Sequence, residues 1–402
     1  MLTIRLLVVA LAGMAGLCSI GTAWAANAPG ITATEIKIGQ TQPYSGSAAI
    51  FGAVGKAEQA YFRMIDDQGG VNGRKIVFLS LDDAYDPGKT LELTHRLVEQ
   101  DQVAAIFAIQ GASHNLAIRK YLNDNGIPQL FTVTGADVAG DYQHYPWTMG
   151  GTPVYRIEAQ IYGRHILIEK PDAKIAVLYQ NDNFGKAYLV GLKQVFGKSY
   201  EQRVVKAASY EETDTTIDPQ IMALQASGAD TLITAATAKH AVRAIAKVYD
   251  LGWHPMHFIT FTASSVPTVL APAGLDKSKG LITATSYEDP GDSRWTQDGS
   301  LAPYDALVAK YLPGEDRENF YFLVGYTVAQ AMIQVLKQCG DDLSRENIMR
   351  QAASLRDFQP VGLLPGVSFF TSRTKYLPIV EAALQRFDGE KWILFGDIMA
   401  GR

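Results

Sequence analysis

A strand, a glycine-rich turn, a helix and a second strand follow one another between residues 36 and 81. This unit limits the possible folds more than any other stretch. Residues 36–40 alternate between apolar and polar, as in a strand with one buried face. After a polar turn at 41–47, apolar side chains recur at helical spacing until Gly69-Gly70. The run 75–81 is apolar enough to be buried on both faces, so the unit predicts a parallel α/β sheet.

The same unit recurs along the chain and predicts two α/β lobes. The first lobe is expected to continue with helices at 89–100 and 113–123 and strands at 103–109 and 129–133. Residues 148–155 are expected to be a connector, followed by a helix at 158–168. The second lobe is expected to have strands at 175–179, 203–209, 231–234 and 257–260, and helices at 186–196, 217–226 and 239–249. A strand at 281–286, a loop at 288–303, a helix at 319–338 and two strands that meet at Asp388-Gly389 complete the prediction.

The composition permits a large core and two domains. The chain has 402 residues, of which 47% are hydrophobic and 19% are charged. Its net charge is −5, and both signs are spread along the sequence without long runs of one sign. A nucleic-acid partner is therefore not expected.

The first 25 residues have the pattern of a secretory signal peptide. A single charge at Arg5 precedes a short apolar run, and Ala23-Trp24-Ala25 forms a small-x-small cleavage site. We expect cleavage after Ala25 rather than a membrane anchor, because the apolar run is short and is interrupted by glycines. Cys339 is then the only cysteine of the exported protein, which would have no internal disulfide.

Four motifs in a fixed order carry a family resemblance. They are I-K-I-G-Q at 36–40, P-Y-S-G at 43–46, G-G-V-N-G-R-K at 69–75 and D-D-A-Y-D-P at 82–87. In these motifs the chain resembles the type I periplasmic solute-binding proteins of the branched-chain amino-acid (Leu/Ile/Val) ABC transporter family. The resemblance continues through Gly185 and Leu251-Gly252-Trp253 to the strand of Trp392, and so covers nearly the whole mature chain.

The resemblance implies an α/β fold of two doubly wound parallel-sheet lobes joined by three crossing segments. Residues 26–150 plus 287–361 would form lobe 1, and residues 151–286 plus 362–402 would form lobe 2. Hinges are expected at 150–153, near Ser286 and at 360–365. Tyr85 stands where family members often have a bridging Cys, so packing has to hold that corner.

The resemblance also implies a location and partners. We expect a monomer in the periplasm, without a cofactor, that binds a small amino acid or organic acid. It would pass this ligand to ABC permease and ATPase subunits in the inner membrane. A ligand-sensing receptor of the same fold is the alternative binding function.

Ligands of doubly wound sheets lie outside the carboxyl ends of the strands, so the loops after strands are candidate binding loops. In Gln110-Gly111-Ala112-Ser113, small residues let the backbone approach a ligand, and Ser113 offers a hydroxyl beside the free N–H groups of a helix start. Thr134-Gly135 supplies a further hydroxyl and amide. These groups suit a carboxylate, and the resemblance places the α-carboxylate of the ligand at this pair of loops. Alternatively, Ser113 only caps its own helix.

Aromatic side chains are candidates for the apolar wall of the site. Phe184 stands where family members place an aromatic in the cleft, and Phe51 and Tyr44 lie on the facing loop of the first lobe. Each of the three could instead be an ordinary core residue. The loops of the second lobe add three further candidates, Asn183, Thr237 and Thr262.

The chain departs from the family at Thr262. Amino-acid-binding members have a Glu there that pairs with the ligand ammonium, whereas residues 257–275 contain no acid. An unpaired buried ammonium is costly, so either Asp182 or Asp137 takes over or the ligand has no amine. We favour a small aromatic or aliphatic carboxylate or a related amide, with a branched-chain amino acid as the alternative.

The sequence lacks the common catalytic motifs. It contains neither a G-x-x-x-x-G-K-[ST] phosphate loop, nor a G-x-G-x-x-G after a strand, nor a G-x-S-x-G elbow. His254 and His257 flank Pro255 without further metal-ligand motifs, so we expect no metal site. Asp82 and Asp83 are expected to serve a turn and a helix cap. We therefore do not expect an enzyme, and a secreted hydrolase is the rival from that class.

Overall fold

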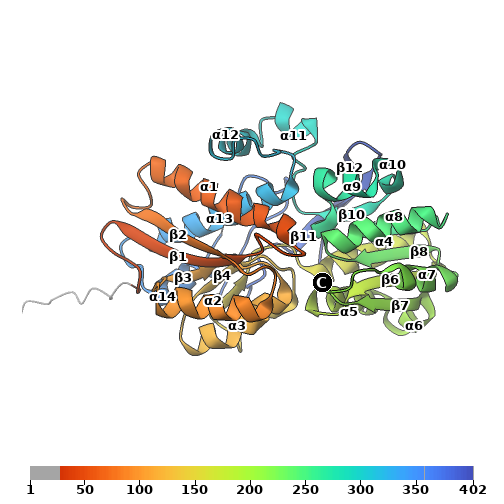
Figure 1. Cartoon of the computed structure of the whole chain (residues 1–402), viewed down its shortest axis with the longest axis horizontal. Coiled ribbons are helices and arrows are strands. Elements are labelled where there is room, and N and C mark those ends of the chain that lie inside the picture. Colours follow the sequence, from red (N-terminus) through yellow and green to blue (C-terminus); the bar gives the residue numbers. More distant parts are fainter. Residues whose placement is uncertain (1–27, 357, 402) are drawn as a thin grey trace, which may run out of the picture.

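The structure is a computed structural model in which residues 28–356 and 358–401 are described. Two α/β lobes lie side by side along the longest axis of the molecule (Figure 1). The predicted signal peptide, Met1 to Ala25, lies outside the described residues.

The sheet of the first lobe has five strands in the order β2-β1-β3-β4-β5, all parallel to their neighbours. Its strands are β1 (Glu35–Gln42), β2 (Lys75–Asp82), β3 (Ala105–Phe107), β4 (Gln129–Thr132) and β5 (Thr148–Gly150). β3 is shorter than predicted because Ala108 leaves the extended conformation, with a φ of 49°. The predicted connector at 148–155 is wrong at its start, since Met149 is buried in β5 and the strand is too short to show a pattern.

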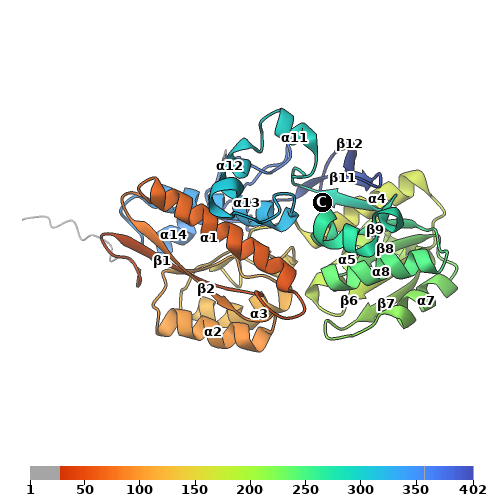
Figure 2. The same cartoon turned by 45° about the horizontal axis from the view of Figure 1, so that its top comes forward.

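Helices cover both faces of this sheet. In Figures 1 and 2, α1 and α13 lie on one face and α2 and α3 on the other. The long helix α13 is buried nearly all round, begins at the side-chain cap of Asn319 and ends at Gly340, whose φ is 59°. The helices are α1 (Gly52–Asp67), α2 (Pro87–Glu99), α3 (Ala112–Asp124), α12 (Ala302–Tyr311), α13 (Phe320–Cys339) and α14 (Arg345–Ala352), with short 3-10 helices at Ala49–Phe51 and Asp137–Gly140.

The sheet of the second lobe has seven strands in the order β12-β11-β10-β9-β8-β6-β7. The predicted final pair of strands is present, but β11 pairs antiparallel with both β10 and β12, so this edge of the parallel sheet is mixed. The strands are β6 (Ile175–Gln180), β7 (Val204–Tyr210), β8 (Thr231–Ala235), β9 (Met256–Ile259), β10 (Ile282–Thr285), β11 (Glu381–Phe387) and β12 (Trp392–Ala400).

The direction of the strand order reverses at β6, which puts α5 and the pair α7 and α8 on opposite faces of the second sheet. The predicted loop at 288–303 is wrong in part, because it holds α11 and the start of α12. The helices of this lobe are α4 (Tyr155–Glu169), α5 (Asn183–Phe196), α6 (Tyr200–Arg203), α7 (Asp218–Ala226), α8 (Ala238–Asp250), α9 (Ala271–Ala273) and α10 (Leu275–Ser278), with 3-10 turns at Gly197–Ser199 and Phe261–Ala263 and a π turn at Val266–Leu270. The short helix α11 (Ser293–Gln297) follows β10 and precedes α12.

The chain passes between the lobes at three places. One is the segment from β5 to α4, and a second follows β10, where Tyr287 pairs with Leu363 and the N–H of Leu364 donates to the carbonyl of Ser286 over 2.9 Å. The predicted boundaries, 26–150 plus 287–361 and 151–286 plus 362–402, remain a proposal.

The contacts of residues 367–378 bear on the position of the third crossing. The ring of Phe369 packs on Phe131 of the first lobe, with ring centroids 5.6 Å apart, and the N–H of Gly150 donates to the carbonyl of Tyr376 over 3.0 Å. Residues 367–378 therefore return to the first lobe. These contacts favour a crossing at 378–381 rather than at 360–365.

The D-D-A-Y-D-P motif serves turns and a helix cap, but the cap is Asp86 and neither Asp82 nor Asp83, so the predicted cap was placed on the wrong residues. The Asp82 carboxylate accepts from the N–H groups of Tyr44 and Ala84 over 3.0 and 2.9 Å, and Asp86 caps α2. Tyr85, which stands where the resemblance implies a Cys, is buried against His114 with ring centroids 4.2 Å apart. Packing thus holds this corner.

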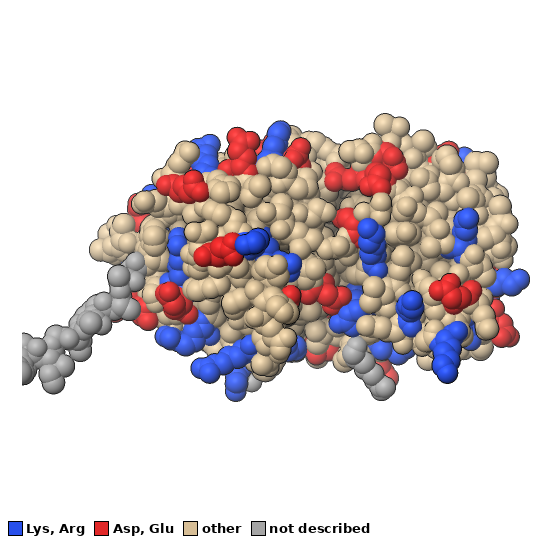
Figure 3. All heavy atoms as spheres, turned by 90° about the horizontal axis from the view of Figure 1, so that it is seen from below, with Lys and Arg blue, Asp and Glu red and all other residues tan. Residues whose placement is uncertain are grey.

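The charged side chains form a mixed surface. On the face shown in Figure 3, acidic and basic groups are interspersed over both lobes. Within residues 28–356 and 358–401, the structure contains no helix that is long and apolar enough to cross a membrane.

Candidate functional site

The segments that follow β1, β3, β4 and β5, together with the start of α13, meet the loop after β9 of the second lobe. Between them lies a cavity of about 20 Å³, which we call the aromatic cavity. A volume of this size holds little more than one water molecule, so the structure shows a closed form of the cleft. The cavity is lined by Phe51, Val54, Gln110, Val133, Thr152, Tyr155, Phe261, Thr262, Phe320, Tyr321 and Val324.

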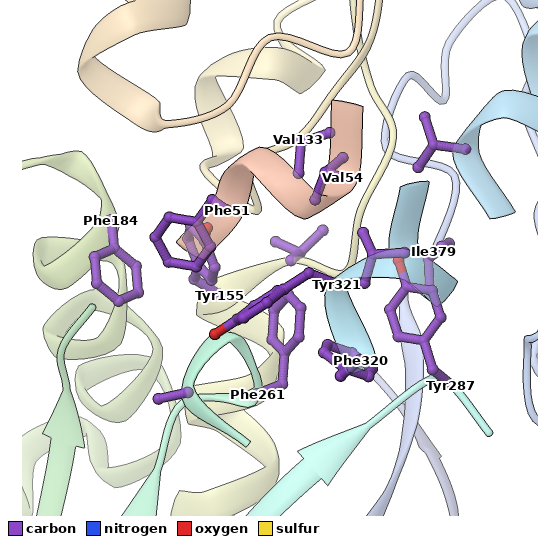
Figure 4. Packing of buried hydrophobic residues seen from close by; sticks show 14 of the residues in the cluster. Phe51, Val54, Val133, Tyr155, Phe184, Phe261, Tyr287, Phe320, Tyr321 and Ile379 are labelled. Atoms are coloured by element: carbon purple, nitrogen blue, oxygen red, sulfur yellow. The ribbon is translucent and has the colours of Figure 1, made fainter. Parts of the chain in front are cut away.

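Rings from both lobes form the walls of this cavity (Figure 4). Phe51 packs edge-on against Tyr321, with ring centroids 5.1 Å apart. Tyr155 packs in the same way against Phe184, with centroids 4.7 Å apart. Phe51 thus lines the aromatic cavity, where an apolar group of a ligand would be desolvated, whereas Phe184 packs on Tyr155 and is not among the lining residues.

Two residues that line the aromatic cavity each have a buried polar atom without a hydrogen bond. Among the described residues, nothing bonds to the amide oxygen of Gln110 or to the hydroxyl of Thr152. Their side chains belong to residues that are only 6% and 2% exposed. Burying an unbonded polar atom costs free energy, so these two atoms are suited to bond a polar group of a ligand.

The start of α3, with the free N–H groups of its first turn, directly follows Gln110. Gly111 precedes the first helical residue, Ala112, and has a φ of 97°. A Cβ at this position would lie 2.5 Å from Nδ1 of His114, so only glycine fits without a shift. Since Gly111 rather than Ser113 is the cap residue, the capping alternative for Ser113 is wrong. The hydroxyl of Ser113 is available beside the N–H groups of the first turn.

Thr134 and Gly135 contact Tyr155 rather than open space. The N–H of Tyr155 donates to the carbonyl of Gly135 over 2.9 Å. The side chain of Thr134 forms a hydrogen bond with the phenol of Tyr155. A Cβ on Gly135 would lie 2.2 Å from the carbonyl oxygen of Pro153. These two residues therefore position a wall of the cavity.

A second cavity, of about 180 Å³, lies next to the start of α3. We call it the acidic cavity, because three carboxylates reach it. Burial raises the pKa of Asp182, against the opposing hydrogen bonds from Gly185 and Gln180, and burial likewise raises that of Glu212. The hydroxyl of Ser47 bonds to Glu212 over 2.7 Å and so connects the lobes. The cavity is lined by Tyr85, Pro87, Ser113, His114, Gln180, Asn181, Asp182, Glu211 and Glu212.

The remaining candidates lie beside the cavities. The hydroxyl of Tyr44 bonds to Ser80 over 2.6 Å within the first lobe, which favours its structural reading. Thr237 bonds to Gln180 over 3.3 Å, and Asn183 is the first residue of α5. Asp137 is paired with Arg156 at 3.0 Å, which leaves Asp182 as the better partner for a ligand ammonium.

Three further residues of the site were missed from the sequence. Tyr155 falls in the predicted connector, and Thr152 precedes it on the same segment. Tyr321 starts the long helix α13, and its hydroxyl donates to the carbonyl of Thr262 across the cleft over 2.8 Å. Tyr155 follows β5, a strand that was itself missed, and Tyr321 follows no strand, so only the aromatic character of the two residues could have suggested them.

The match to a family model extends over residues 35–391, and the chain belongs to the periplasmic binding protein family it describes. This confirms the fold class and the family inferred from the motifs. It is a family of binding proteins, so the chain is not an enzyme. In the part of the chain that the structure describes, no group of three or more His, Cys, Asp or Glu side chains could hold a metal ion.

Several individual proteins are similar to this chain, at low sequence identity. "Leu/Ile/Val-binding protein homolog 8" of Brucella suis is 23% identical over 350 residues, which is 84% of each chain. The structure of a branched-chain amino-acid ABC transporter protein from Thermus thermophilus with bound valine matches with a TM-score of 0.81 and 14% identity, over 92% of this chain and 98% of that one. A fatty acid ABC transporter substrate-binding protein from Thermomonospora curvata matches with a TM-score of 0.72 and 20% identity, over 94% and 95% of the two chains.

Proposed function

We propose that the chain is the substrate-binding component of an ABC importer. It captures a small carboxylate-bearing solute in the periplasm, closes its two lobes over it and delivers it to a permease with an ATPase in the inner membrane. The observation that carries this proposal is the aromatic cavity between the lobes, with the unbonded polar atoms of Gln110 and Thr152 beside the start of α3. The predicted signal peptide supports the location.

The proposed ligand has an apolar body and a carboxylate. Rings of both lobes would enclose the apolar body, and the N–H groups at the start of α3 with the hydroxyl of Ser113 would bond the carboxylate. Valine and fatty acids, which the names of two similar structures mention, share this chemistry and differ in the amine. We favour an aromatic or aliphatic acid without an amine, because the aromatic cavity is lined by neutral groups only.

A branched-chain amino acid is the second candidate, and the acidic cavity is the observation that favours it. Asp182 lies in that cavity with Ser113, so a ligand whose carboxylate bonds to α3 could place an ammonium near Asp182. However, Asp182 also caps α5 by accepting from the N–H of Gly185 over 3.1 Å. Its charge is thereby partly offset by the helix dipole.

A thermal-shift screen tests the proposal and separates the two candidates. Leucine, valine and phenylalanine are compared with their deaminated analogues, 4-methylpentanoate, 3-methylbutanoate and 3-phenylpropanoate. A solute that binds only the native state raises the melting temperature by mass action. We expect the deaminated acids to raise it. A rise with the amino acids alone would establish the second candidate, and no rise with any carboxylate would contradict the proposed ligand class.

Transport and sensing are distinguished by the protein that the closed, ligand-bound form activates. We expect the ligand-bound protein to stimulate ATP hydrolysis by its partner ABC permease complex. Stimulation of a sensor kinase instead would favour the receptor alternative. Sedimentation of the free protein tests the expectation of a monomer.

A further inference from the structure

A buried carboxyl group lies directly behind the wall of the aromatic cavity. Glu158 of α4 is 3% exposed. One of its oxygens accepts from the N–H of Phe261 over 2.7 Å and also contacts the hydroxyl of Tyr162. The other oxygen accepts from the hydroxyl of Tyr188 of α5 over 2.5 Å.

If Glu158 were ionised, the surrounding hydroxyl groups would have too few protons to bond every acceptor oxygen. The phenol oxygen of Tyr162 lies 2.6 Å from the carbonyl oxygen of Ile259 and also within hydrogen-bond distance of Glu158. A carbonyl and a carboxylate both only accept, whereas a phenol has one proton to donate. If Glu158 carries a proton, it donates to Tyr162, and Tyr162 donates to Ile259. All the contacts are then satisfied.

We propose that Glu158 is protonated in the native protein and acts as a positioning residue for the ligand site. Through Phe261 it fixes the loop after β9, whose Phe261 and Thr262 line the aromatic cavity. The carbonyl of Thr262 in turn accepts from Tyr321 across the cleft over 2.8 Å. When Glu158 ionises, the one phenol proton of Tyr162 can serve the carboxylate or the carbonyl of Ile259 but not both. The bond that holds Ile259, at the end of β9 just before this loop, is then lost.

The surroundings of Glu158 support the neutral form. Burial raises its pKa to about 7, against the opposing hydrogen bonds from Tyr162, Tyr188 and Phe261. The titratable groups that face it are these two phenols and Tyr155, and Glu381 of β11 lines the same small cavity of about 10 Å³. The loop after β9 adds the hydroxyl of Thr260, which bonds to Tyr188 over 2.6 Å, and β10 adds Thr283 beside Tyr162. None of these groups is a cation.

The consequence for ligand binding rests on the proposed function. If only the protonated form holds the loop, the apparent Kd follows the protonated fraction and rises about tenfold from pH 6 to pH 8. Asp182, Glu212 and His114 of the acidic cavity can also titrate, and Glu158→Gln separates their effect from that of Glu158. We expect the rise to be lost in Glu158→Gln, because the amide stays neutral and keeps the shape of the side chain.

Infrared spectroscopy tests the protonation without a ligand. At pH 6 we expect the wild-type protein to show a protonated carboxyl C=O band that Glu158→Gln lacks. The band should lose intensity as the pH is raised to 8. Equal spectra for the two proteins at pH 6 would overturn the proposal, even if the chain proved to bind an unexpected solute.

Calorimetric titration with 4-methylpentanoate, or with leucine if the screen selects it, tests the positioning role. Glu288→Gln is the matched control, because burial also raises the pKa of Glu288 to about 7, whereas its carboxylate bonds to Ser300 over 3.0 Å. We expect the control to keep the pH dependence of Kd. Equal pH profiles for the wild type and Glu158→Gln would overturn the positioning role.

Tyr188→Phe provides a test if Glu158→Gln fails to fold. The lost hydroxyl is one of those that lower the pKa of Glu158, so the midpoint of the pH profile should move to a higher pH. An unchanged or lower midpoint would contradict the assignment of the profile to Glu158.

Discussion

At the scale of single residues, Gly111 decides whether α3 can present its N–H groups to a ligand. Ala at this position would have a φ near 97° and would place a Cβ 2.5 Å from His114. Gly73 has a φ of 79° but has nothing within 4 Å of an added Cβ, so it is the matched control.

We predict that Gly111→Ala loses more stability than Gly73→Ala. Both variants lose roughly 1–2 kcal/mol of stability because alanine is strained in the left-handed backbone conformation. Only Gly111→Ala also brings a Cβ into a clash with His114. Urea unfolding measures the difference. Equal losses in the two variants would show that the approach of His114 to Gly111 is unimportant.

Because the hydroxyl of Thr152 is unbonded, we predict that its removal changes stability and ligand affinity in opposite directions. Thr152→Val removes a buried polar atom that lacks a partner, so the free protein should gain up to roughly 1 kcal/mol of stability. Ligand affinity should fall, because the hydroxyl no longer meets the ligand. Melting temperature and Kd are measured on the same variant. A loss of stability with unchanged affinity would remove Thr152 from the site.

The hydroxyl of Ser113 has a similar test. Ser113→Ala should weaken binding of the carboxylate by about 1 kcal/mol, while the fold is retained. Ser227→Ala, which removes a hydroxyl bonded to the carbonyl of Leu224 at the end of α7, is the control. Equal affinities for the two variants would place the carboxylate elsewhere.

At the scale of elements, helical and strand periodicity predicted most of both sheets. It failed where tertiary contacts decide the backbone. β5 has three residues and is a strand only because it pairs with β4, and Ala108 ends β3 early. The return of residues 367–378 to the first lobe depends on the contact of Phe369 with Phe131, which no local pattern reveals.

The same reason explains which parts of the candidate site could be foreseen. Phe51, Gln110 and Thr262 follow strands, so the topology of doubly wound sheets indicated them. Tyr321 reaches the cavity from α13, about two hundred residues further along the chain than Gln110. Its approach depends on the packing of α13 on α1.

Glu158 and its partners on α4, α5 and β9 give a pH prediction for stability. The pKa of Glu158 is raised from 4.5 to about 7 in the folded protein, so the fold holds its proton more tightly than the unfolded chain does. Its contribution is present in full below pH 4.5 and is lost as the pH rises through about 7. By linkage this amounts to at most roughly 3 kcal/mol.

Glu158→Gln should therefore flatten the fall in stability between pH 5 and pH 8. Burial also raises the pKa of Glu58, so part of the fall in stability with pH should remain in both proteins. Urea unfolding at a series of pH values gives the two curves. Parallel curves for the wild type and the variant would contradict the raised pKa of Glu158.

At the scale of the whole molecule, two hydrogen bonds hold the lobes together across the cleft. They are those of Tyr321 with Thr262 and of Ser47 with Glu212. Tyr321→Phe combined with Ser47→Ala should shift the free protein toward an open form, with a larger radius of gyration by small-angle X-ray scattering. Added ligand should restore the compact form.

Tyr326→Phe, on the same helix but against Tyr61 within the first lobe, is the control and should leave the scattering unchanged. An unchanged radius of gyration in the double variant would show that these two bonds do not hold the cleft closed.

The central claim is that a small carboxylate is enclosed, unaltered, between the two lobes. A crystal structure with the solute that gives the largest thermal shift tests it most directly. We predict intact solute between Phe51 and Phe184, with its carboxylate on the N–H groups of Ala112 and Ser113. Solute bound outside the cleft, or present only as a cleaved product, would contradict the claim.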